Sequence, residues 1–249
     1  MRGRLAAGLA LAALVAGTTA GASAERVAET ASDQVLVGRS VQKRAIQAVQ
    51  IGDPAGSRVA LVVGVIHGDE PGGLRILAAI KRRAADERAA LEGTQLWAIE
   101  TVNPDGLRAH TRKNAHGVDL NRNFPYRWRD DVPRSNGYYP GPRPASEPET
   151  RSVLAFVRRI HPDLSIWYHQ PWGAVLACRG RPPIAAEYAK LVGMRTSCRG
   201  KGLHGTAITW EMHAFPGTAA FVVEMPPGNV TGATADRQAR AALTVAEGR

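Results

Sequence analysis

The sequence predicts an α/β fold: a single domain with a mixed, largely parallel twisted sheet and helices on both faces. Continuously apolar, β-branched runs such as residues 59–66 are typical of strands buried on both faces. These runs alternate with helical patterns along the chain, as in sheets that helices cover on both sides. The chain has 249 residues, 44% apolar and 22% charged, which excludes a disordered protein and a coiled coil. No linker divides it into two domains.

The first predicted elements follow this alternation. Residues 25–50 form a short opening segment with one or two strands. The buried strand at 59–66 leads into a helix from Glu70 to about Ala85, and Pro71 suits the first turn of that helix. A second buried strand covers residues 95–102.

The middle of the chain is predicted to be irregular. Asn103-Pro-Asp-Gly106 is a turn signal, and residues 107–145 are rich in Arg, Asn, Gly and Pro. A loop of this length inside a compact domain is usually functional. Ser146 and Glu149 have the spacing of a capping box that opens a helix with Val153, Leu154, Val157 and Ile160 on one face. Further predicted elements are a strand at 164–168, a helix at 182–192, a strand at 219–223 and a helix at 235–247.

The first residues have the build of a secretory signal peptide. A positive start precedes an apolar run at 5–16, and Ala22-Ser-Ala24 fits a small-residue cleavage site. The run is shorter than the roughly 20 residues that span a bilayer, and no cysteine follows it for lipidation. We therefore expect residues 1–24 to be removed near Ala24 and the mature domain, residues 25–249, to be extracytoplasmic, in the periplasm or cell wall. We expect no stable membrane insertion.

The charge balance and the cysteine content bear on the expected partners and on the expected compartment of the protein. Lys and Arg number 32 against 22 Asp and Glu, a formal net charge of +10. This excess suits an anionic cell wall, and no basic stripe interleaved with aromatic residues points to nucleic acid. In an oxidising compartment Cys178 and Cys198 can form a disulfide across a separation of 20 residues, with two buried free thiols as the alternative.

Three polar side chains come directly after predicted buried strands: His67, His169 and Glu224. Ligands of open α/β sheets bind outside the carboxyl ends of the strands, so these distant positions can converge at one edge. His67 and Glu70 have the spacing H-x-x-E, which lets a strand end and a helix start face one point. Alone this spacing occurs by chance, and its joint placement with the other residues is what favours a site.

This residue set suits one zinc ion. Imidazole nitrogens from His67 and His169 and a carboxylate oxygen from Glu70 make three protein ligands for Zn²⁺. A catalytic zinc keeps a fourth position for water and lowers the pKa of that water toward ~7. Glu224 would then act as the general base that takes the water proton and returns it to the leaving amine. Cobalt and manganese also accept nitrogen and oxygen ligands.

The motifs and their order resemble the zinc metallocarboxypeptidases of the carboxypeptidase A type. They are His67-Gly-Asp-Glu70, Asn103-Pro-Asp-Gly106, Arg112-Lys-Asn114, Val118-Asp-Leu-Asn-Arg-Asn-Phe124, Ser146-Glu-Pro-Glu149, His169 and Glu224. The resemblance covers most of residues 38–226, and its compact loops look more like the bacterial murein peptide amidase branch than the digestive enzymes. It implies a carboxypeptidase A-like fold and a zinc-dependent catalytic domain over residues 25–249.

The resemblance also implies residue roles. His67, Glu70 and His169 match the zinc ligands and Glu224 the catalytic carboxylate. Arg112 matches the arginine that polarises the scissile carbonyl and stabilises the oxyanion. Asn121 and Arg122 match the pair that holds a substrate carboxylate, which a planar guanidinium binds with two parallel hydrogen bonds. The alternative interpretations are a solvated loop charge for Arg112 and loop bracing for Asn121 and Arg122.

Two departures leave side-chain specificity open. The family often has an arginine between the paired ligands, where this chain has Asp69. Digestive members carry a mobile tyrosine ahead of the catalytic glutamate, whereas residues 202–223 contain no tyrosine. His213 or Trp210 could line the pocket in its place.

The expected function is a secreted zinc metallopeptidase that hydrolyses an amide bond next to a free carboxylate. The expected substrate is a peptide or muropeptide, such as a γ-D-glutamyl–diaminopimelate linkage of peptidoglycan. One alternative keeps the chemistry: an ordinary C-terminal peptidase, or an N-acyl amino-acid deacylase of the succinylglutamate desuccinylase/aspartoacylase type. Another is a non-catalytic module that binds wall peptides. The completeness of the catalytic set argues against this last alternative.

Overall fold

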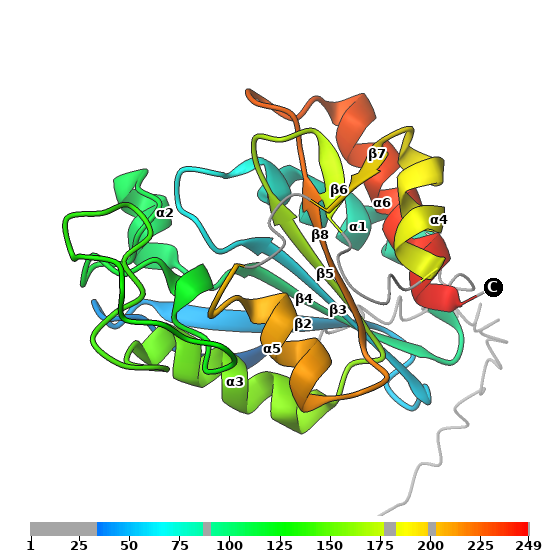
Figure 1. Cartoon of the computed structure of the whole chain (residues 1–249). Coiled ribbons are helices and arrows are strands. Elements are labelled where there is room, and N and C mark those ends of the chain that lie inside the picture. Colours follow the sequence, from blue (N-terminus) through cyan, green and yellow to red (C-terminus); the bar gives the residue numbers. More distant parts are fainter. Residues whose placement is uncertain (1–33, 87–90, 177–182, 199–202, 249) are drawn as a thin grey trace, which may run out of the picture. The chain divides into compact units, whose positions relative to one another are not determined.

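The computed structural model describes residues 34–86, 91–176, 183–198 and 203–248. Within these ranges, eight strands form one sheet (Figure 1). In spatial order they are β1 (Gln34–Arg39), β2 (Ala45–Gly52), β4 (Thr94–Thr101), β3 (Arg58–Val65), β5 (Leu164–His169), β8 (Ala219–Glu224), β6 (Ala174–Leu176) and β7 (Arg195–Ser197). The central strands β4, β3, β5 and β8 are parallel. β1 and β2 are antiparallel at one side, and β6 is antiparallel to β8 at the other. The predicted mixed, largely parallel sheet is confirmed.

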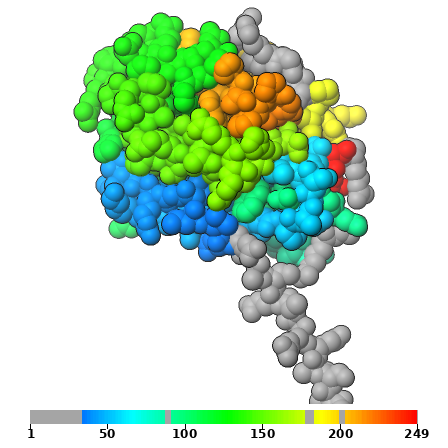
Figure 2. Space-filling model, turned by 90° about the horizontal axis from the view of Figure 1, so that it is seen from below, coloured from blue at the N-terminus to red at the C-terminus, as the bar shows by residue number. Residues whose placement is uncertain are grey.

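Helices cover both faces of this sheet (Figure 1). On one face lie α1 (Gly72–Asp86), α4 (Pro183–Val192) and α6 (Gly232–Glu247). On the other lie α3 (Pro148–Ile160) and α5 (Ala207–Ala214), side by side in Figure 2. The Arg158 guanidinium of α3 lies 5.4 Å from the Trp210 ring of α5. A short helix, α2 (Pro104–Ala109), and a 3₁₀ turn, η2 (Leu120–Arg122), interrupt the long connection between β4 and α3.

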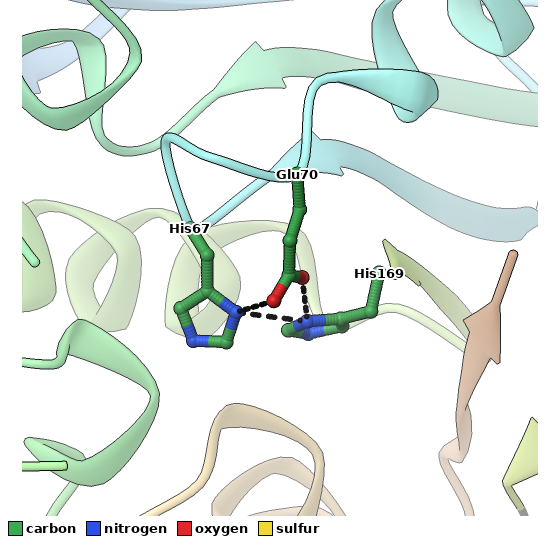
Figure 3. Close-up of side chains that lie close together, drawn as sticks. All are labelled: His67, Glu70 and His169. Atoms are coloured by element: carbon green, nitrogen blue, oxygen red, sulfur yellow. Dashed lines mark hydrogen bonds and ion pairs between the residues drawn. The ribbon is translucent and has the colours of Figure 1, made fainter. Parts of the chain in front are cut away.

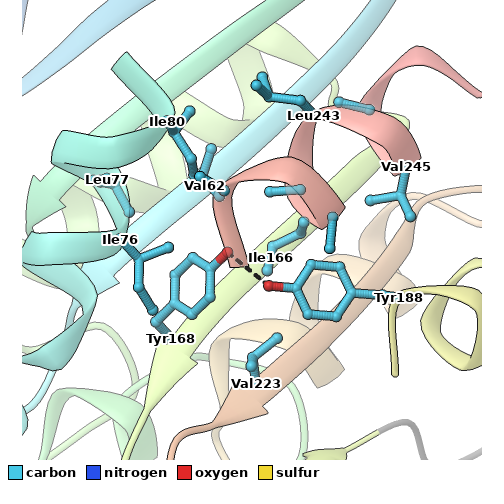
Figure 4. Packing of buried hydrophobic residues seen from close by; sticks show 14 of the residues in the cluster. Val62, Ile76, Leu77, Ile80, Ile166, Tyr168, Tyr188, Val223, Leu243 and Val245 are labelled. Atoms are coloured by element: carbon cyan, nitrogen blue, oxygen red, sulfur yellow. Dashed lines mark hydrogen bonds between the residues drawn. The ribbon is translucent and has the colours of Figure 1, made fainter. Parts of the chain in front are cut away.

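The strand β5 shows how the sequence separates the two cores. Every residue of β5 is buried, and successive side chains of a strand point to opposite faces. Ile166 and Tyr168 therefore pack beneath α1 and α6, where the Tyr168 hydroxyl lies 2.9 Å from that of Tyr188 (Figure 4). Trp167 packs into the second core, with residues of α3 and α5. Apolar contacts thus hold the sheet from both sides.

The parallel strands bring the predicted polar residues to one edge of the sheet. His169 and Glu224 are direct partners in the ladder between β5 and β8. His67 lies two residues beyond β3, the neighbour of β5 on its other side. The three residues are far apart in the sequence and meet because their strands end together.

Two local predictions differ from the structure. The sequence at 103–106 forms the start of α2 instead of a simple turn, because the Asn103 side chain accepts from the Gly106 amide and Pro104 fits the first turn. The predicted capping box of α3 does not form. Its N-cap is Glu147, without a side-chain cap bond, and Glu149 instead accepts from the Val41 amide at 2.9 Å.

Two predictions fall wholly or partly outside the described residues. The signal peptide, residues 1–24, lies there, and so does Cys178, one partner of the proposed disulfide with Cys198. Both stay predictions. Among the described helices, none has the length and apolar character needed to cross a membrane.

Candidate metal centre and active site

Three predicted ligands converge on one point at the edge of the sheet (Figure 3). The turn between β3 and α1 carries His67 and Glu70, and the Glu70 amide donates to the His67 carbonyl at 3.1 Å. His67 Nδ1 lies 2.9 Å from Glu70 Oε1 and 3.1 Å from His169 Nδ1. His169 Nδ1 lies 2.9 Å from Glu70 Oε2. Both imidazoles and both carboxylate oxygens therefore face a common centre.

This donor set fits a single zinc ion. One ligand atom from each of the three residues lies within 4.8 Å of the others, and two imidazole nitrogens with a carboxylate are a zinc-binding combination. The Asp119 carboxylate orients the His67 ring: His67 Nε2 donates a hydrogen bond to Asp119 Oδ1 at 3.1 Å. That bond places the proton on Nε2 and leaves Nδ1 free as a ligand.

Asp119 also fixes Arg112. Arg112 donates from Nε to Asp119 Oδ2 at 3.0 Å and from Nη1 to Glu70 Oε1 at 3.1 Å. Burial opposes the ionised form of Asp119, but the charge and hydrogen bond of His67 and the charge of Arg112 hold its pKa well below the usual range. Burial likewise disfavours the charged form of Arg112. The negative charges of Asp119 and Glu70 outweigh this effect and raise the pKa of Arg112. A permanent cation thus lies beside the candidate metal centre.

Glu224 presents an uncommitted carboxylate oxygen. The residue ends β8 and accepts a hydrogen bond from the Trp172 backbone amide. Its Oε2 is buried and has no hydrogen-bond partner among the described residues. Burial, together with the negative charge of Glu70, raises the pKa of Glu224 to about 7. A carboxylate in this state is suited to exchange a proton near neutral pH.

Asn121 and Arg122 sit on η2, opposite α5. Asn121 Oδ1 accepts from the Ala207 amide at 3.0 Å, and its Nδ2 lies 3.4 Å from His169 Nε2. Arg122 donates from Nη1 to the Asn121 carbonyl at 2.6 Å. Burial lowers the pKa of Arg122, and the like charge of Arg112 adds to this, while Asp119 opposes it.

All seven predicted metal, catalytic and substrate-binding residues line one cavity of about 430 Å³. They are His67, Glu70, Arg112, Asn121, Arg122, His169 and Glu224. The rest of the described lining is uncharged. An apolar wall is formed by Leu176 of β6, Ile208 and Met212 of α5, and Val222 of β8.

Sequence reasoning missed two residues of this site and misplaced two others. Asp119 belongs to the Val118–Phe124 motif, which the sequence analysis singled out. The motif does not, however, predict that Asp119 contacts both His67 and Arg112. Tyr138 lines the cavity from the long loop. His213 instead stacks on Tyr126, with ring centroids 3.9 Å apart, and neither His213 nor the buried Trp210 is among the described cavity-lining residues.

The fold and this residue set define an α/β protein with a candidate nitrogen–oxygen metal site at the carboxyl edge of its sheet. The family model described as zinc carboxypeptidase matches residues 22–177. The chain therefore belongs to the zinc carboxypeptidase family. The matched region contains six of the seven predicted site residues and ends before Glu224.

Individual curated relatives agree with this placement. The chain is 34% identical to murein peptide amidase A of Escherichia coli K12 over 137 residues, which cover 50% of this chain and 53% of the relative. It is 29% identical to the carboxypeptidase N catalytic chain of Rattus norvegicus over 174 residues, covering 57% of this chain and 38% of the relative. The chain thus spans about half the length, or less, of these curated relatives.

Two solved structures share the fold. The murein-tripeptide amidase MpaA of Escherichia coli O157 superposes with a TM-score of 0.67 at 24% identity, covering 86% of this chain and 91% of that one. The carboxypeptidase A of Helicoverpa armigera superposes with a TM-score of 0.72 at 19% identity, covering 87% and 69%.

Proposed function

We propose that the protein is a zinc-dependent hydrolase that cleaves an amide bond next to a free carboxylate. The observation that carries this proposal is the uncommitted Oε2 of Glu224 in the cavity that also holds the ligand set. Glu211 Oε2 is also buried without a partner among the described residues, but Glu211 does not line the cavity, so the position of the Glu224 oxygen beside the ligand set is what carries the argument. Here the unpaired oxygen lies where a reacting group would enter.

The residues divide the chemistry between them. His67, Glu70 and His169 would hold the zinc ion, which when bound supplies Lewis-acid activation of water and of the scissile carbonyl. Glu224 accepts the proton of the attacking water and delivers it to the leaving nitrogen. Arg112 stabilises the negative charge that develops on the carbonyl oxygen. Arg122, with Asn121, binds the terminal carboxylate of the substrate.

The test of this assignment is Glu224→Gln. The amide keeps the shape of the side chain but cannot accept and return the proton, so we expect kcat to fall by roughly 10²- to 10⁴-fold. Zinc content, measured by metal analysis, should be unchanged. Glu211→Gln is the matched control, because Glu211 is also buried but does not line the cavity. Full activity of the Glu224 variant would refute the general-base role.

The substrate class we favour is a peptidoglycan-derived peptide, and specifically an amide bond such as γ-D-glutamyl–diaminopimelate. The support is the similarity to proteins named murein peptide amidase A and murein-tripeptide amidase. The predicted export signal and the basic balance of the chain suit a substrate in the anionic cell wall. N-terminal sequencing of the protein recovered outside the cytoplasm would test cleavage near Ala24.

The apolar wall of the cavity favours a second candidate, an ordinary C-terminal peptidase. Diaminopimelate carries a charged amino and carboxyl group on its side chain, and burying them against Leu176 and Met212 would leave both unpaired. The acidic residues of the described lining are Glu70 and Glu224, which are assigned to zinc binding and proton transfer, so neither is available to pair with the amino group of the side chain.

A single comparison separates the candidates. A muropeptide tripeptide, an N-blocked dipeptide ending in leucine and an N-acetyl amino acid are offered side by side to the zinc-loaded protein. Highest kcat/KM on the muropeptide supports the amidase, on the dipeptide the C-terminal peptidase, and on the acyl amino acid the deacylase. Binding of the muropeptide with no product from any of the three would support the non-catalytic module.

A further inference from the structure

Tyr138 lies over both arginines of the site and has no role in the chemistry described so far. It belongs to the long loop between η2 and α3, and it is 50% exposed. Its ring centroid lies 4.8 Å from Cζ of Arg112 and 5.3 Å from Cζ of Arg122. One aromatic ring therefore contacts two cations within the cavity.

The loop that carries Tyr138 is fastened to the same segment as the arginines. The Tyr138 amide donates to Asn136 Oδ1 at 2.8 Å, which forms a tight turn. The next carbonyl, that of Tyr139, accepts from the Asp119 amide at 2.8 Å. Because Asp119 also binds Arg112, the ring and the guanidinium share one anchor. The position of Tyr138 is thus set by backbone contacts, although its side chain is half exposed.

Arg122 is the arginine that needs such a contact. The like charge of Arg112 repels it, and the nearby Asp119 already pairs with Arg112 and His67. Within the described residues the Arg122 guanidinium makes one hydrogen bond, to the Asn121 carbonyl. A ring face attracts a cation without using any N–H donor. Tyr138 can therefore hold the Arg122 guanidinium in place while its remaining donors stay available for a carboxylate.

We propose that Tyr138 is a positioning residue whose ring holds Arg122 for the terminal carboxylate of the substrate. This inference rests on the proposed function, because it assumes that a carboxylate binds at Arg122. The ring acts on binding: it orders the Arg122 guanidinium before the substrate arrives, so the substrate does not have to order it. Arg112 is already held by Asp119 and Glu70. The Tyr138 ring takes no part in proton transfer, which belongs to Glu224.

The test uses Tyr138→Ala, Tyr138→Phe and the control Tyr126→Ala. Tyr126 is a tyrosine of the same loop whose ring stacks on His213 instead of a guanidinium. With an N-blocked dipeptide bearing a free carboxylate, Tyr138→Ala should raise KM by about five- to twentyfold, the value of losing cation–π contacts, with kcat within about twofold. Tyr138→Phe keeps the ring and should stay within about twofold of wild type, as should Tyr126→Ala.

Two further readouts make the result decisive. The C-terminal amide of the same dipeptide should show no difference between wild type and Tyr138→Ala, because it offers no carboxylate. Calorimetric binding of the product, an N-acetyl amino acid, should weaken by the same factor as KM in Tyr138→Ala, with or without zinc. An unchanged KM and product affinity in Tyr138→Ala would overturn the inference. So would a loss in Tyr138→Phe as large as in Tyr138→Ala, since the hydroxyl would then be responsible.

The proposed function can fail separately. A wild-type protein that cleaves none of these amides contradicts the hydrolase assignment, while product binding still measures the contribution of Tyr138. Absence of any product binding in wild type would overturn the positioning role as well.

Discussion

At the scale of single residues, Asp119 organises the site more than any of the predicted ligands. Its two carboxylate oxygens are divided between His67 Nε2 and Arg112 Nε, so one side chain sets both a ligand tautomer and a cation. Its own backbone is fixed by the bond from its amide to the Tyr139 carbonyl. Loss of the charge on Asp119 should therefore disturb metal binding without removing a ligand.

We predict that Asp119→Asn lowers zinc affinity by about 10- to 100-fold, because an amide holds the His67 tautomer less firmly than a carboxylate. Competition with a calibrated chelator measures this. Asp236→Asn is the control, since the Asp236 carboxylate forms an ion pair with Arg82 at the surface and does not line the cavity. Equal zinc affinity in the Asp119 variant and wild type would contradict the organising role.

The residue scale also shows where sequence reasoning ends. The sequence predicts the positions of three site residues because each follows a buried strand: His67, His169 and Glu224. The end of a buried strand can be predicted from the pattern of apolar residues. Asp119 and Tyr138 follow no strand. Their positions depend on how residues 107–145 fold, and neither periodicity nor propensity specifies the path of such a loop.

At the scale of elements, α5 joins the core to the cavity. It contributes Ile208 and Met212 to the apolar wall, and it also carries Glu211, which is fully buried and does not line the cavity. Glu211 Oε1 accepts from Trp167 Nε1 at 3.2 Å, and Oε2 has no partner among the described residues. Neither α5 nor the three-residue strands β6 and β7 could be predicted, because such short segments show no clear period.

Glu211 should make stability depend on pH. Burial raises the pKa of Glu211 to about 7, although hydrogen bonds from Ser165 and Trp167 oppose this. The folded protein therefore binds this proton more tightly than the unfolded chain, whose glutamate has a pKa near 4.5. Stability contributed by the protonated form is present below about pH 4.5 and is lost as the pH rises to about 7.

We predict that Glu211→Gln raises the free energy of unfolding at pH 8 by on the order of 3 kcal/mol, because the amide removes the buried charge. At pH 4 the variant and wild type should be nearly equal. Urea unfolding at both pH values, in excess zinc, measures the difference. A variant with the same pH dependence as wild type would show that Glu211 does not titrate in this range.

At the scale of the whole molecule, the fold was predictable because its signals are long and repeated. Each long element can be predicted from its own sequence pattern. This holds for buried strands of six to eight residues, such as β3 and β5, and for helices such as α1 and α6. Their parallel pairing follows from the alternation of strand and helix. The strand order, with β8 between β5 and β6, does not follow from any local pattern, since it depends on long-range packing.

This separation of core and site leads to a prediction about metal removal. The predicted ligands lie at one edge of the sheet, whereas two apolar cores hold the sheet itself. Chelation should therefore abolish hydrolysis and leave the far-ultraviolet circular dichroism spectrum unchanged, with activity restored by added zinc. The thermal midpoint should fall, because a ligand at about 1,000 times its Kd stabilises the folded state by about 4 kcal/mol. Collapse of the spectrum on chelation would mean that the metal is needed for the fold as well as for the chemistry.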